Sequence, residues 1–352
     1  MIFLPFDGLN PYQAELSRAL GAMKTAVIPA PVHPWLPLAS LLWKFKDARI
    51  IHLHWLSGYM VKDSLCKSLC WSALFCMEAL AAKLAGRKLV WTVHNLLEHE
   101  RRYAKIELFF LKVLARHLDH FFVHGTHARD VVMKTLGIAE RKVSVVPHGH
   151  YIDAYPNTIS RDEARKALGV ADSASVFLFF GQIRDYKGVG DLLAAFRDPA
   201  LKEATLIVAG RPQSPRLAGN LVSAAGGCSN VRLHLHFIPA EEVQVFMNAA
   251  DYAVFPFREI FTSGSIMLAM SFGRKVIVPE VPSLAETIAV MNGIVFKPEQ
   301  SGGLLAALVQ AQQLVSHDDK GQNLQYAKSC GWDKSAAHIC RVYRHLMSRE
   351  GG

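Results

Sequence analysis

The run from Phe255 to Ile277 constrains the fold of this chain more than any other segment. It begins with a short apolar strand that ends in Pro256, passes through an Arg-Glu pair and the small residues Thr-Ser-Gly-Ser, and enters an apolar stretch of helical length. Gly273 closes that stretch, and a second apolar strand follows at once. This order of strand, loop, helix and strand predicts a βαβ unit, which requires a parallel sheet.

The small-residue loop in this run consists of Thr262, Ser263, Gly264 and Ser265. It lies at a predicted helix N-terminus, where the first backbone N–H groups have no partner inside the helix and can bind a phosphate. An ordinary turn in which Ser or Thr caps the helix is equally consistent with these residues.

A second segment has related features. An apolar strand at 176–180 leads into a turn that begins with Gly181, carries Arg184 and Lys187, and enters an apolar-periodic helix. Ligands of open parallel sheets bind at the carboxyl ends of the strands. Arg grips phosphate through two parallel hydrogen bonds, and Lys acts as a point charge. Together the two loops predict a diphosphate site, although a single such cation would ordinarily be a solvated surface charge.

Short apolar strands alternate with segments of helical length along most of the chain, which predicts an α/β protein with parallel sheets. The polar segment 153–158 interrupts this alternation and is predicted to be a linker. Helices are expected at Arg161–Leu168 and Asp333–Met347. The strands are predicted at 26–28, 50–54, 89–93, 120–123 and 143–146 in the first half, and at 176–180, 205–209, 231–236, 252–255, 276–278 and 294–296 in the second.

Length and composition agree with this organisation. At 352 residues the chain exceeds the size at which one core keeps growing, so two domains are expected. Six cysteines are scattered without a Cys-x-x-Cys pair, and the start of the chain lacks the basic region and cleavage site of a secretory leader. A reducing, cytoplasmic location is therefore expected.

The chain resembles the GT-B nucleotide-sugar glycosyltransferases, specifically the family 4 group (glycosyl transferases group 1) of the bacterial exopolysaccharide and glycolipid type. The resemblance rests on the order and spacing of several short segments spread over most of the chain. These segments are 10–13, 91–95, 145–149, 181–193, 204–210, 249–256 and 263–277.

The resemblance implies a GT-B fold, which is two Rossmann-like domains with a cleft between them. Residues 1–153 would form the acceptor-binding domain and residues 154–332 the nucleotide-sugar-binding domain. Residues 333–352 would form a last helix that crosses back to the first domain, as the last helix of these enzymes often does.

The activity implied is transfer of a sugar from a UDP- or GDP-sugar to a lipid-linked or polysaccharide-precursor acceptor in cell-surface glycan biosynthesis (a hexosyltransferase, EC 2.4 type). Such enzymes stabilise the leaving diphosphate with cations and helix N-termini. No cofactor or metal is expected, because the chain has no Asp-x-Asp suited to Mg²⁺ or Mn²⁺. The residues expected to bind the donor are Gly181, Arg184, Lys187, Arg258, Thr262, Ser263, Gly264, Ser265 and Glu286.

Two glutamates flank the small-residue loop in this family, and the resemblance assigns the first to Glu259. The second would fall at Leu268, which cannot accept a hydrogen bond from a ribose. Glu286 is a candidate for contact with the nucleotide instead, and a solvated helix-start glutamate is the alternative. Donor recognition is therefore expected to depart from the family pattern.

In the first half, His94 ends a predicted strand, and the resemblance places such a histidine beside the donor sugar and acceptor. Glu100 follows as a possible base, so His94, Glu259, Lys187 and Glu100 are the expected catalytic residues. Asn10, Tyr12 and His127 are expected on the acceptor side. His52 and His54 alternate along one strand and share a face, which favours packing over a metal site because no third ligand is evident.

The charge of +9 is concentrated in the first half, where residues 1–155 carry 19 Lys and Arg against 12 Asp and Glu. Nucleic acid is not an expected partner, because basic and aromatic residues are not interleaved and no zinc finger is present. Segment 34–46, with Trp35, Trp43, Lys44 and Lys46, and the helix that begins near Arg101 and Arg102 are typical of interfacial helices. Core-facing helices with a solvated basic face are the alternative.

An anionic inner-membrane surface is thus an expected partner, with the protein peripheral on the inner face of the cell membrane. The apolar segment 64–86 is not expected to span a bilayer, because Lys67, Glu78 and Lys83 interrupt it. Two other functions fit the same fold. One is a non-hydrolysing nucleotide-sugar epimerase, and the other is a non-catalytic nucleotide- or glycan-binding protein, suggested by Leu268.

Overall fold

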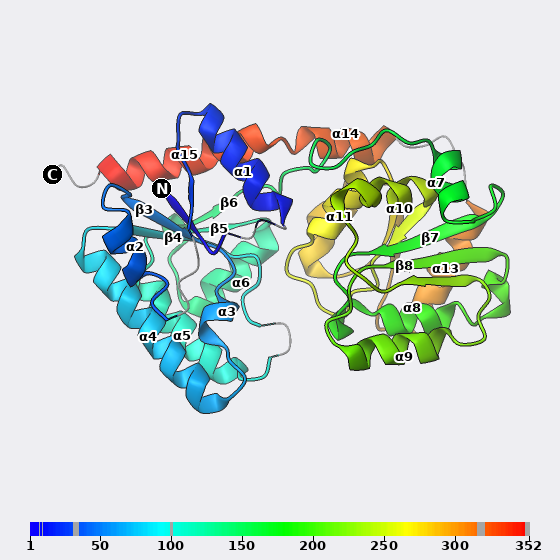
Figure 1. Ribbon diagram of the computed structural model, residues 1–352, viewed down its shortest axis with the longest axis horizontal. Coiled ribbons are helices and arrows are strands. Elements are labelled where there is room, and N and C mark those ends of the chain that lie inside the picture. The colour runs from blue at the N-terminus through cyan, green and yellow to red at the C-terminus, as the bar shows by residue number, and fades with distance from the viewer. Residues whose placement is uncertain (7, 9, 31–34, 99–100, 315–320, 349–352) are drawn as a thin grey trace. The chain divides into compact units, whose positions relative to one another are not determined.

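The computed structural model describes the chain except residues 7, 9, 31–34, 99–100, 315–320 and 349–352 (Figure 1). The chain divides into two compact units: unit 1 comprises Met1–Gly149 together with Gly331–Gly352, and unit 2 comprises His150–Cys330. Each unit contains a six-stranded parallel sheet, so the predicted α/β class with two Rossmann-like domains is confirmed.

The sheet of unit 1 has the strand order β2-β1-β3-β4-β5-β6. Its strands are β1 (Ile2–Leu4), β2 (Ile28–Pro29), β3 (Ile50–Leu53), β4 (Lys88–Thr92), β5 (His120–Val123) and β6 (Val143–Val145). Its helices are α1 (Pro11–Ala22), α2 (Ala39–Lys44), α3 (Ser57–Met60), α4 (Leu65–Leu84), α5 (Ala104–His117), α6 (Thr126–Leu136) and α15 (Trp332–Ser348). The strands β3, β4 and β5 are buried almost throughout, which explains their continuous apolar runs.

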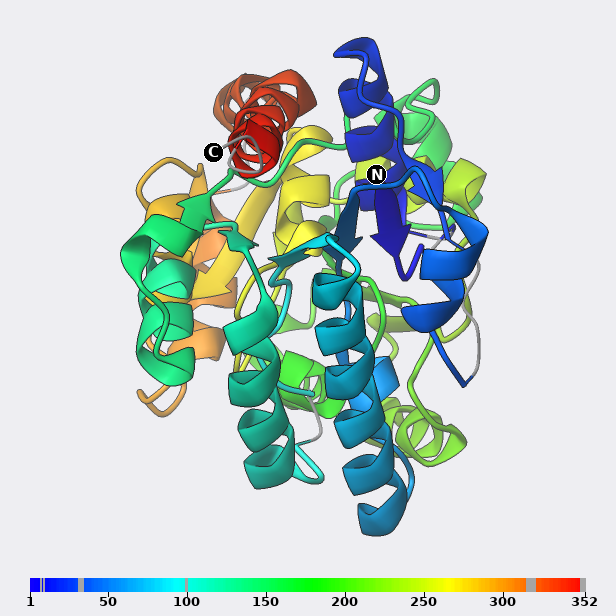
Figure 2. The same cartoon turned by 90° about the vertical axis from the view of Figure 1, so that its left-hand side faces the viewer.

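Helices cover both faces of this sheet. α4 and α5 lie side by side and contact each other on one face (Figures 1 and 2). α1 and α15 contact each other on the opposite face, although they come from the two ends of the sequence (Figure 1). Unit 1 is therefore discontinuous in sequence, and α15 is part of it.

The sheet of unit 2 has the order β12-β11-β10-β7-β8-β9. Its strands are β7 (Ser175–Phe180), β8 (Ala204–Ala209), β9 (Val231–His234), β10 (Tyr252–Val254), β11 (Lys275–Pro279) and β12 (Gly293–Phe296). Its helices are α7 (Arg161–Ala167), α8 (Val189–Ala195), α9 (Pro215–Ala225), α10 (Val243–Ala249), α11 (Gly264–Ser271), α12 (Ala285–Ile288), α13 (Gly303–Gln313) and α14 (Gly321–Ser329). The predicted strands of both units are present, with ends that differ by no more than one or two residues.

The polar segment 153–158 is tied to unit 2. The Gln244 side-chain oxygen accepts hydrogen bonds from the backbone N–H groups of Thr158 and Ile159, at 2.7 and 3.3 Å. The Asn248 amide donates to the Asn157 side chain at 2.8 Å. This segment is therefore held against α10 at its Thr158 end.

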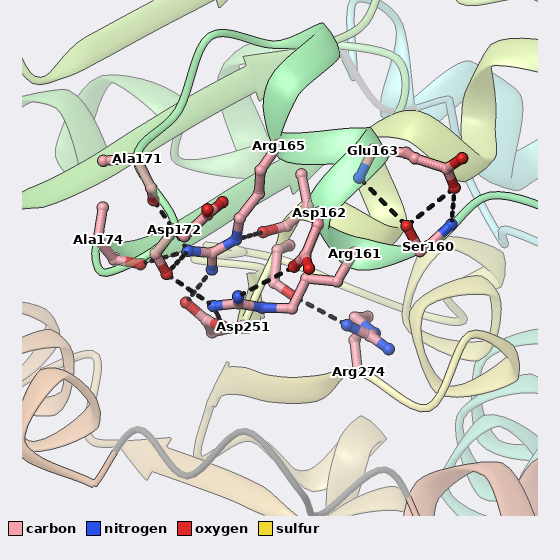
Figure 3. A network of polar contacts seen from close by, with 12 residues as sticks. Ser160, Arg161, Asp162, Glu163, Arg165, Ala171, Asp172, Ala174, Asp251 and Arg274 are labelled. Carbon is pink, nitrogen blue, oxygen red and sulfur yellow. Dashed lines mark hydrogen bonds and ion pairs between the residues drawn. The ribbon is translucent and has the colours of Figure 1, made fainter.

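A charged network fastens the amino ends of β7 and β10 in unit 2 (Figure 3). Arg165 is fully buried, and its Nη2 donates to Asp251 Oδ2 at 2.8 Å. The same carboxylate oxygen accepts the Val176 N–H at 2.8 Å, and Arg161 pairs with the other oxygen at 3.4 Å. The rest of the Arg165 guanidinium donates to the carbonyls of Ala171, Asp172, Ala174 and Ala249. A buried cation with this many partners holds α7, β7 and the start of β10 in one arrangement.

Candidate functional site

The loops that follow β7 and β8 are joined by backbone hydrogen bonds at the carboxyl edge of the sheet in unit 2. The Ile183 N–H donates to the Arg211 carbonyl, and the Gln213 N–H donates to the Ile183 carbonyl, both at 3.0 Å. Gly210 has a φ of +146°, and a Cβ there would lie 1.9 Å from the Gly181 carbonyl oxygen. Only glycine permits this approach, so the two loops form one rigid platform.

Three of the predicted donor-binding residues meet on this platform. A Cβ placed on Gly181 would lie 2.9 Å from Ser265 Oγ and 3.7 Å from Lys187 Nζ. Gly181 therefore leaves space between a hydroxyl and an ammonium group. Gly188, next to Lys187 in the sequence, has a φ of +70°. A Cβ at Gly188 would lie 2.0 Å from the Pro256 carbonyl oxygen. The turn that carries Lys187 therefore packs directly on the loop after β10.

Lys187 is a half-buried cation that forms no ion pair among the described residues. Burial, aided by repulsion from Arg184, lowers the pKa of Lys187 to about 8. Its Nζ lies 5.9 Å from the centre of the Phe257 ring. Because desolvation disfavours the charged form, an anion bound beside this ammonium would relieve an electrostatic cost.

The N-terminus of α11 adjoins Lys187 through Ser265. Ser263 is the N-cap, and its Oγ accepts the Ile266 N–H at 3.2 Å. Thr262, Gly264 and Ser265 are half-buried at the same helix end. The partial positive charge of a helix N-terminus favours an anion at this position. Ser263 is thus an ordinary helix cap, and the geometry is also compatible with an anion site at the same helix end.

The other predicted donor-binding residues are placed differently. Arg258 forms a two-point ion pair with Asp191, at 2.9 and 2.7 Å, and both side chains are exposed. The Arg184 guanidinium donates to the Gln182 side chain at 3.4 Å. Glu259 and Glu286 are exposed, and Glu286 lies in the first turn of the short helix α12. Leu268 is buried inside α11, as expected for an apolar side chain.

A cluster of histidine side chains lies at the carboxyl edge of the sheet in unit 1. Its members are His52 of β3, His54 directly after β3, His94 after β4, His124 after β5 and His148 after β6, and Tyr12 of α1 packs in its centre. The Tyr12 ring contacts His94, His124 and His148 edge-on, with ring centres 4.7, 5.4 and 5.2 Å apart. We call these six residues the histidine cluster.

His94 is buried at the middle of the cluster. Its Nε2 lies 3.1 Å from His54 Nδ1, and its ring stacks on Trp55 with the ring centres 4.5 Å apart. The indole N–H of Trp91 donates to the His54 carbonyl at 2.8 Å. Burial, together with the nearby histidines His124, His148 and His52, lowers the pKa of His94 well below its usual value, so the imidazole is neutral.

The remaining histidines of the cluster are neutral for the same reason. Burial lowers the pKa of His52 and His124 to about 3 and that of His148 to about 4. His124 Nδ1 lies 2.9 Å from the Val146 carbonyl and therefore carries the proton. His124 Nε2 is left as a buried acceptor without a partner among the described residues, as is one nitrogen of His54, its Nε2.

A chain of hydrogen bonds connects the cluster to α15. Tyr343 Oη lies 2.5 Å from His52 Nδ1, and His52 Nε2 lies 2.7 Å from Thr92 Oγ1. Burial raises the pKa of Tyr12, and the Thr92 side chain offsets part of that rise. Trp332, at the start of α15, packs edge-on against Tyr12 with the ring centres 5.0 Å apart.

Of the three predicted acceptor-side residues, Tyr12 belongs to the histidine cluster. Asn10 caps α1 through its side chain, which accepts the Tyr12 N–H at 3.0 Å. His127 is half-buried in the first turn of α6, and it is His124 whose ring contacts Tyr12. Glu100 lies outside the described residues. No group of three or more His, Cys, Asp or Glu residues suited to a metal ion occurs in the described part of the chain.

A hollow of about 610 Å³ lies at the opposite, amino edge of the same sheet. Met23, Ile50 and Tyr343 line it together with Cys340, Arg341 and Met347 of α15. It is separate from the histidine cluster, because Ile50 begins β3 whereas His54 follows its end.

Two units that each contain a six-stranded parallel sheet match the GT-B fold of solved glycosyltransferases. The family model described as "Glycosyl transferases group 1" matches residues 174–313, and that described as "Glycosyltransferase Family 4" matches residues 68–153. The chain belongs to this family of glycosyltransferases.

Relatives and solved structures agree with this assignment. The chain is similar to a GDP-mannose:glycolipid 4-beta-D-mannosyltransferase of Xanthomonas campestris pv. campestris, with 25% identity over 87% of this chain and 80% of that protein. Its fold is similar to that of sucrose-phosphate synthase from Thermosynechococcus elongatus, with a TM-score of 0.75 and 17% identity over 97% of this chain and 94% of that one. It is also similar to Anabaena Alr3699/HepE in complex with UDP, with a TM-score of 0.71 and 17% identity over 98% and 99% of the two chains.

Proposed function

We propose that this glycosyltransferase transfers a hexose from a nucleotide-sugar donor to a lipid-linked acceptor in cell-surface glycan biosynthesis. The observation that carries the proposal is the convergence of Gly181, Lys187 and Ser265 at the N-terminus of α11. A desolvated ammonium, a hydroxyl and a helix N-terminus around a glycine suit a diphosphate, which is the leaving group of such a transfer. No metal ion is required by this arrangement.

GDP-mannose is the donor that we propose first, and a UDP-sugar is the second candidate. The relative from Xanthomonas campestris is named for GDP-mannose and a glycolipid acceptor, and its similarity extends over 87% of this chain. The structure of Anabaena Alr3699/HepE was solved with UDP, but at 17% identity it indicates the fold alone.

We assign the acceptor side to the histidine cluster. Transfer of a sugar to a hydroxyl group requires a protein side chain that orients this hydroxyl or takes up its proton. Neutral imidazoles can do this, and His94 and His124 are neutral because burial lowers their pKa values. His124 Nε2 carries a lone pair that has no partner among the described residues, which makes His124 a candidate alongside His94.

A non-catalytic nucleotide-binding protein is the second candidate, and the buried Leu268 favours it. That residue stands where the family resemblance implies a ribose-binding glutamate. Such a protein would bind nucleotides at Lys187 and show no turnover. An epimerase of the same fold would convert the donor sugar without any acceptor.

The test compares GDP-mannose, UDP-glucose and their nucleoside diphosphates in thermal-shift and radiolabel-transfer assays with a bacterial glycolipid extract. We expect GDP-mannose to raise the melting temperature and to label the lipid fraction. Lys187→Ala should reduce transfer by about 2–4 kcal/mol of transition-state stabilisation, that is, about 30-fold or more. Lys202→Ala is the matched control, since Lys202 is exposed with a weak contact at 4.0 Å to Glu203.

Each alternative gives a different result. Nucleotide binding without labelled lipid for any donor would favour the binding protein. An epimerised donor in the absence of extract would favour the epimerase. Normal transfer by Lys187→Ala would place the diphosphate elsewhere.

A further inference from the structure

Helix α4 carries a row of apolar side chains on the side that faces solvent. Leu69, Met77, Leu80 and Leu84 are 40%, 60%, 42% and 81% exposed. Cys66 and Cys70 are exposed on the same turns. Residues spaced by three, four and seven lie along one side of a helix, so these six side chains form a continuous stripe. We call it the α4 stripe, and it runs for about 27 Å at the rise of an α-helix.

The opposite, buried side of α4 contains both apolar and polar side chains. Ser68 and Ser72 are buried, and the Ser72 hydroxyl donates to the Met60 carbonyl at 3.0 Å. Glu78 is also buried, and its Oε1 accepts the Ala39 N–H at 2.9 Å. A surface helix of a globular protein ordinarily presents polar and charged residues to solvent. The exposed apolar stripe of α4 is therefore the feature that the packing of unit 1 does not explain.

A helix of this length and composition could cross a membrane, and α4 is the one such helix in the described chain. This possibility rests on length and composition alone, and it does not contradict the expectation that segment 64–86 does not span a bilayer. In the structure, however, α4 is a layer of unit 1, with Phe75, Ala79 and Ala82 buried in the fold. A peripheral position, with the helix lying along the surface, is compatible with this packing.

The surroundings of the α4 stripe resemble the interface of a lipid bilayer. Trp35 stacks on Trp71 of α4 with the ring centres 5.3 Å apart, and Lys62 Nζ lies 4.7 Å from the centre of the Trp71 ring. Trp and Lys side chains are characteristic of the headgroup level of a membrane. Phe109 on the neighbouring helix α5 is a further exposed apolar side chain, with 60% exposure.

The segment that contains α4 and α5 has an excess of positive charge, which favours anionic lipid. Residues 62–119 contain ten Lys and Arg against six Asp and Glu. Two of the six, Glu78 and Glu107, are buried and add nothing to the surface. An interface between two protein copies normally has few charges at its centre and no excess of one sign, so the excess of cations argues for a lipid surface.

We infer that the α4 stripe is the membrane-binding surface of this protein and inserts into the interface of an anionic bilayer. The inference concerns a face distinct from both candidate sites and does not depend on the proposed reaction. α4 runs antiparallel to β3 and β4, so its Leu65 end lies toward the same edge of the sheet as the histidine cluster. An acceptor anchored in the bilayer would therefore approach the cluster from that end of α4.

The test is flotation with vesicles of phosphatidylcholine, with and without phosphatidylglycerol, and it needs no activity. We expect the wild-type chain to float with the anionic vesicles. Met77→Gln combined with Leu84→Gln should lower the partition coefficient by about tenfold or more, because two apolar side chains lose their burial in lipid. Val222→Gln with Leu314→Gln is the matched control, since these side chains are 57% and 54% exposed in unit 2.

The inference is overturned if the Met77→Gln/Leu84→Gln variant floats as well as the control variant. It is equally overturned if the wild-type protein floats with neither kind of vesicle. It is also overturned if light scattering shows a dimer that only the stripe variant dissociates, because a second copy would then cover the stripe. Melting temperatures of the two variants should match the wild type, since all four positions are exposed. Loss of flotation with unchanged donor hydrolysis or transfer to a soluble acceptor would separate this surface from the proposed reaction.

Discussion

Mild acid should unfold unit 1, because the native state buries histidines in neutral form. His52, His54, His94, His124 and His148 all have lowered pKa values, and the largest cause in each case is burial. In the unfolded chain each ring has an ordinary pKa near 6.5 and binds a proton in mild acid. The unfolded state thus binds more protons than the native state below pH 6.5, so stability falls as pH falls.

The magnitude follows from the proton difference. When the pH falls from about 7.5 to about 5.5, protonation of one histidine stabilises the unfolded state by about 1.4 kcal/mol. The same change stabilises the native state hardly at all if the native ring has a pKa of 3 to 4. His52, His124 and His148 are such rings, and together they give an upper limit of about 4 kcal/mol, which is a large part of the stability of a typical domain. At pH 5.5 these three rings should account for an uptake of nearly three protons on unfolding, at about 0.9 per ring, and His54 and His94 act in the same direction.

Tryptophan fluorescence isolates this effect, because all six tryptophans of the chain lie in unit 1. Urea titrations at several pH values give the free energy of unfolding and its slope with pH. His148→Asn should lower the slope by about one proton, and His127→Asn, outside the cluster, serves as the control. A free energy that is constant between pH 7.5 and 5.5 would refute the reasoning and would mean that the rings are accessible or already protonated.

Three further outcomes are expected. Asp251→Asn should destabilise unit 2 by about 3–5 kcal/mol in calorimetry, because it leaves the buried Arg165 without its counter-charge, whereas Asp162→Asn, with 81% side-chain exposure, should change little. Gly188→Ala should impair nucleotide binding, since its Cβ would meet the Pro256 carbonyl at 2.0 Å, while Gly190→Ala has open space and should bind normally. Nucleoside diphosphate affinity in titration calorimetry should fall as pH rises through about 8, where Lys187 loses its proton, and Lys187→Arg should remove that dependence.

The fold was predictable from the sequence because buried parallel strands consist of continuous runs of apolar residues. Segment 176–180 is such a run, and it became β7 with five buried residues in succession. The loop chemistry of Gly181 and Ser265 also follows from order along the chain, since both come directly before or within the turn from strand to helix. The convergence of these loops with Lys187 is a property of neighbouring parallel strands, which share one carboxyl edge.

Other features depend on tertiary contacts that no local pattern carries. The sequence showed that His52 and His54 share a face, but not that His94, His124 and His148 would meet them around Tyr12. Arg258 was a reasonable donor ligand by position, yet Asp191, from a distant part of the chain, pairs with it. The exposed apolar stripe of α4 was equally hidden, because an apolar composition does not reveal which side of a helix faces the sheet.

The placement of α15 in unit 1 has a consequence for the order in which the protein can be made. Residues 1–149 leave the ribosome first, but the helix that packs against α1 and supplies Trp332 and Tyr343 follows only after all of unit 2. Unit 2 is continuous in sequence and can fold as it emerges from the ribosome. In residues 1–149, however, Tyr12 and His52 stay without their contacts to Trp332 and Tyr343 until α15 has been synthesised. A recombinant fragment ending at residue 149 should therefore need chaperones or precipitate, and a fragment spanning 150–330 should not.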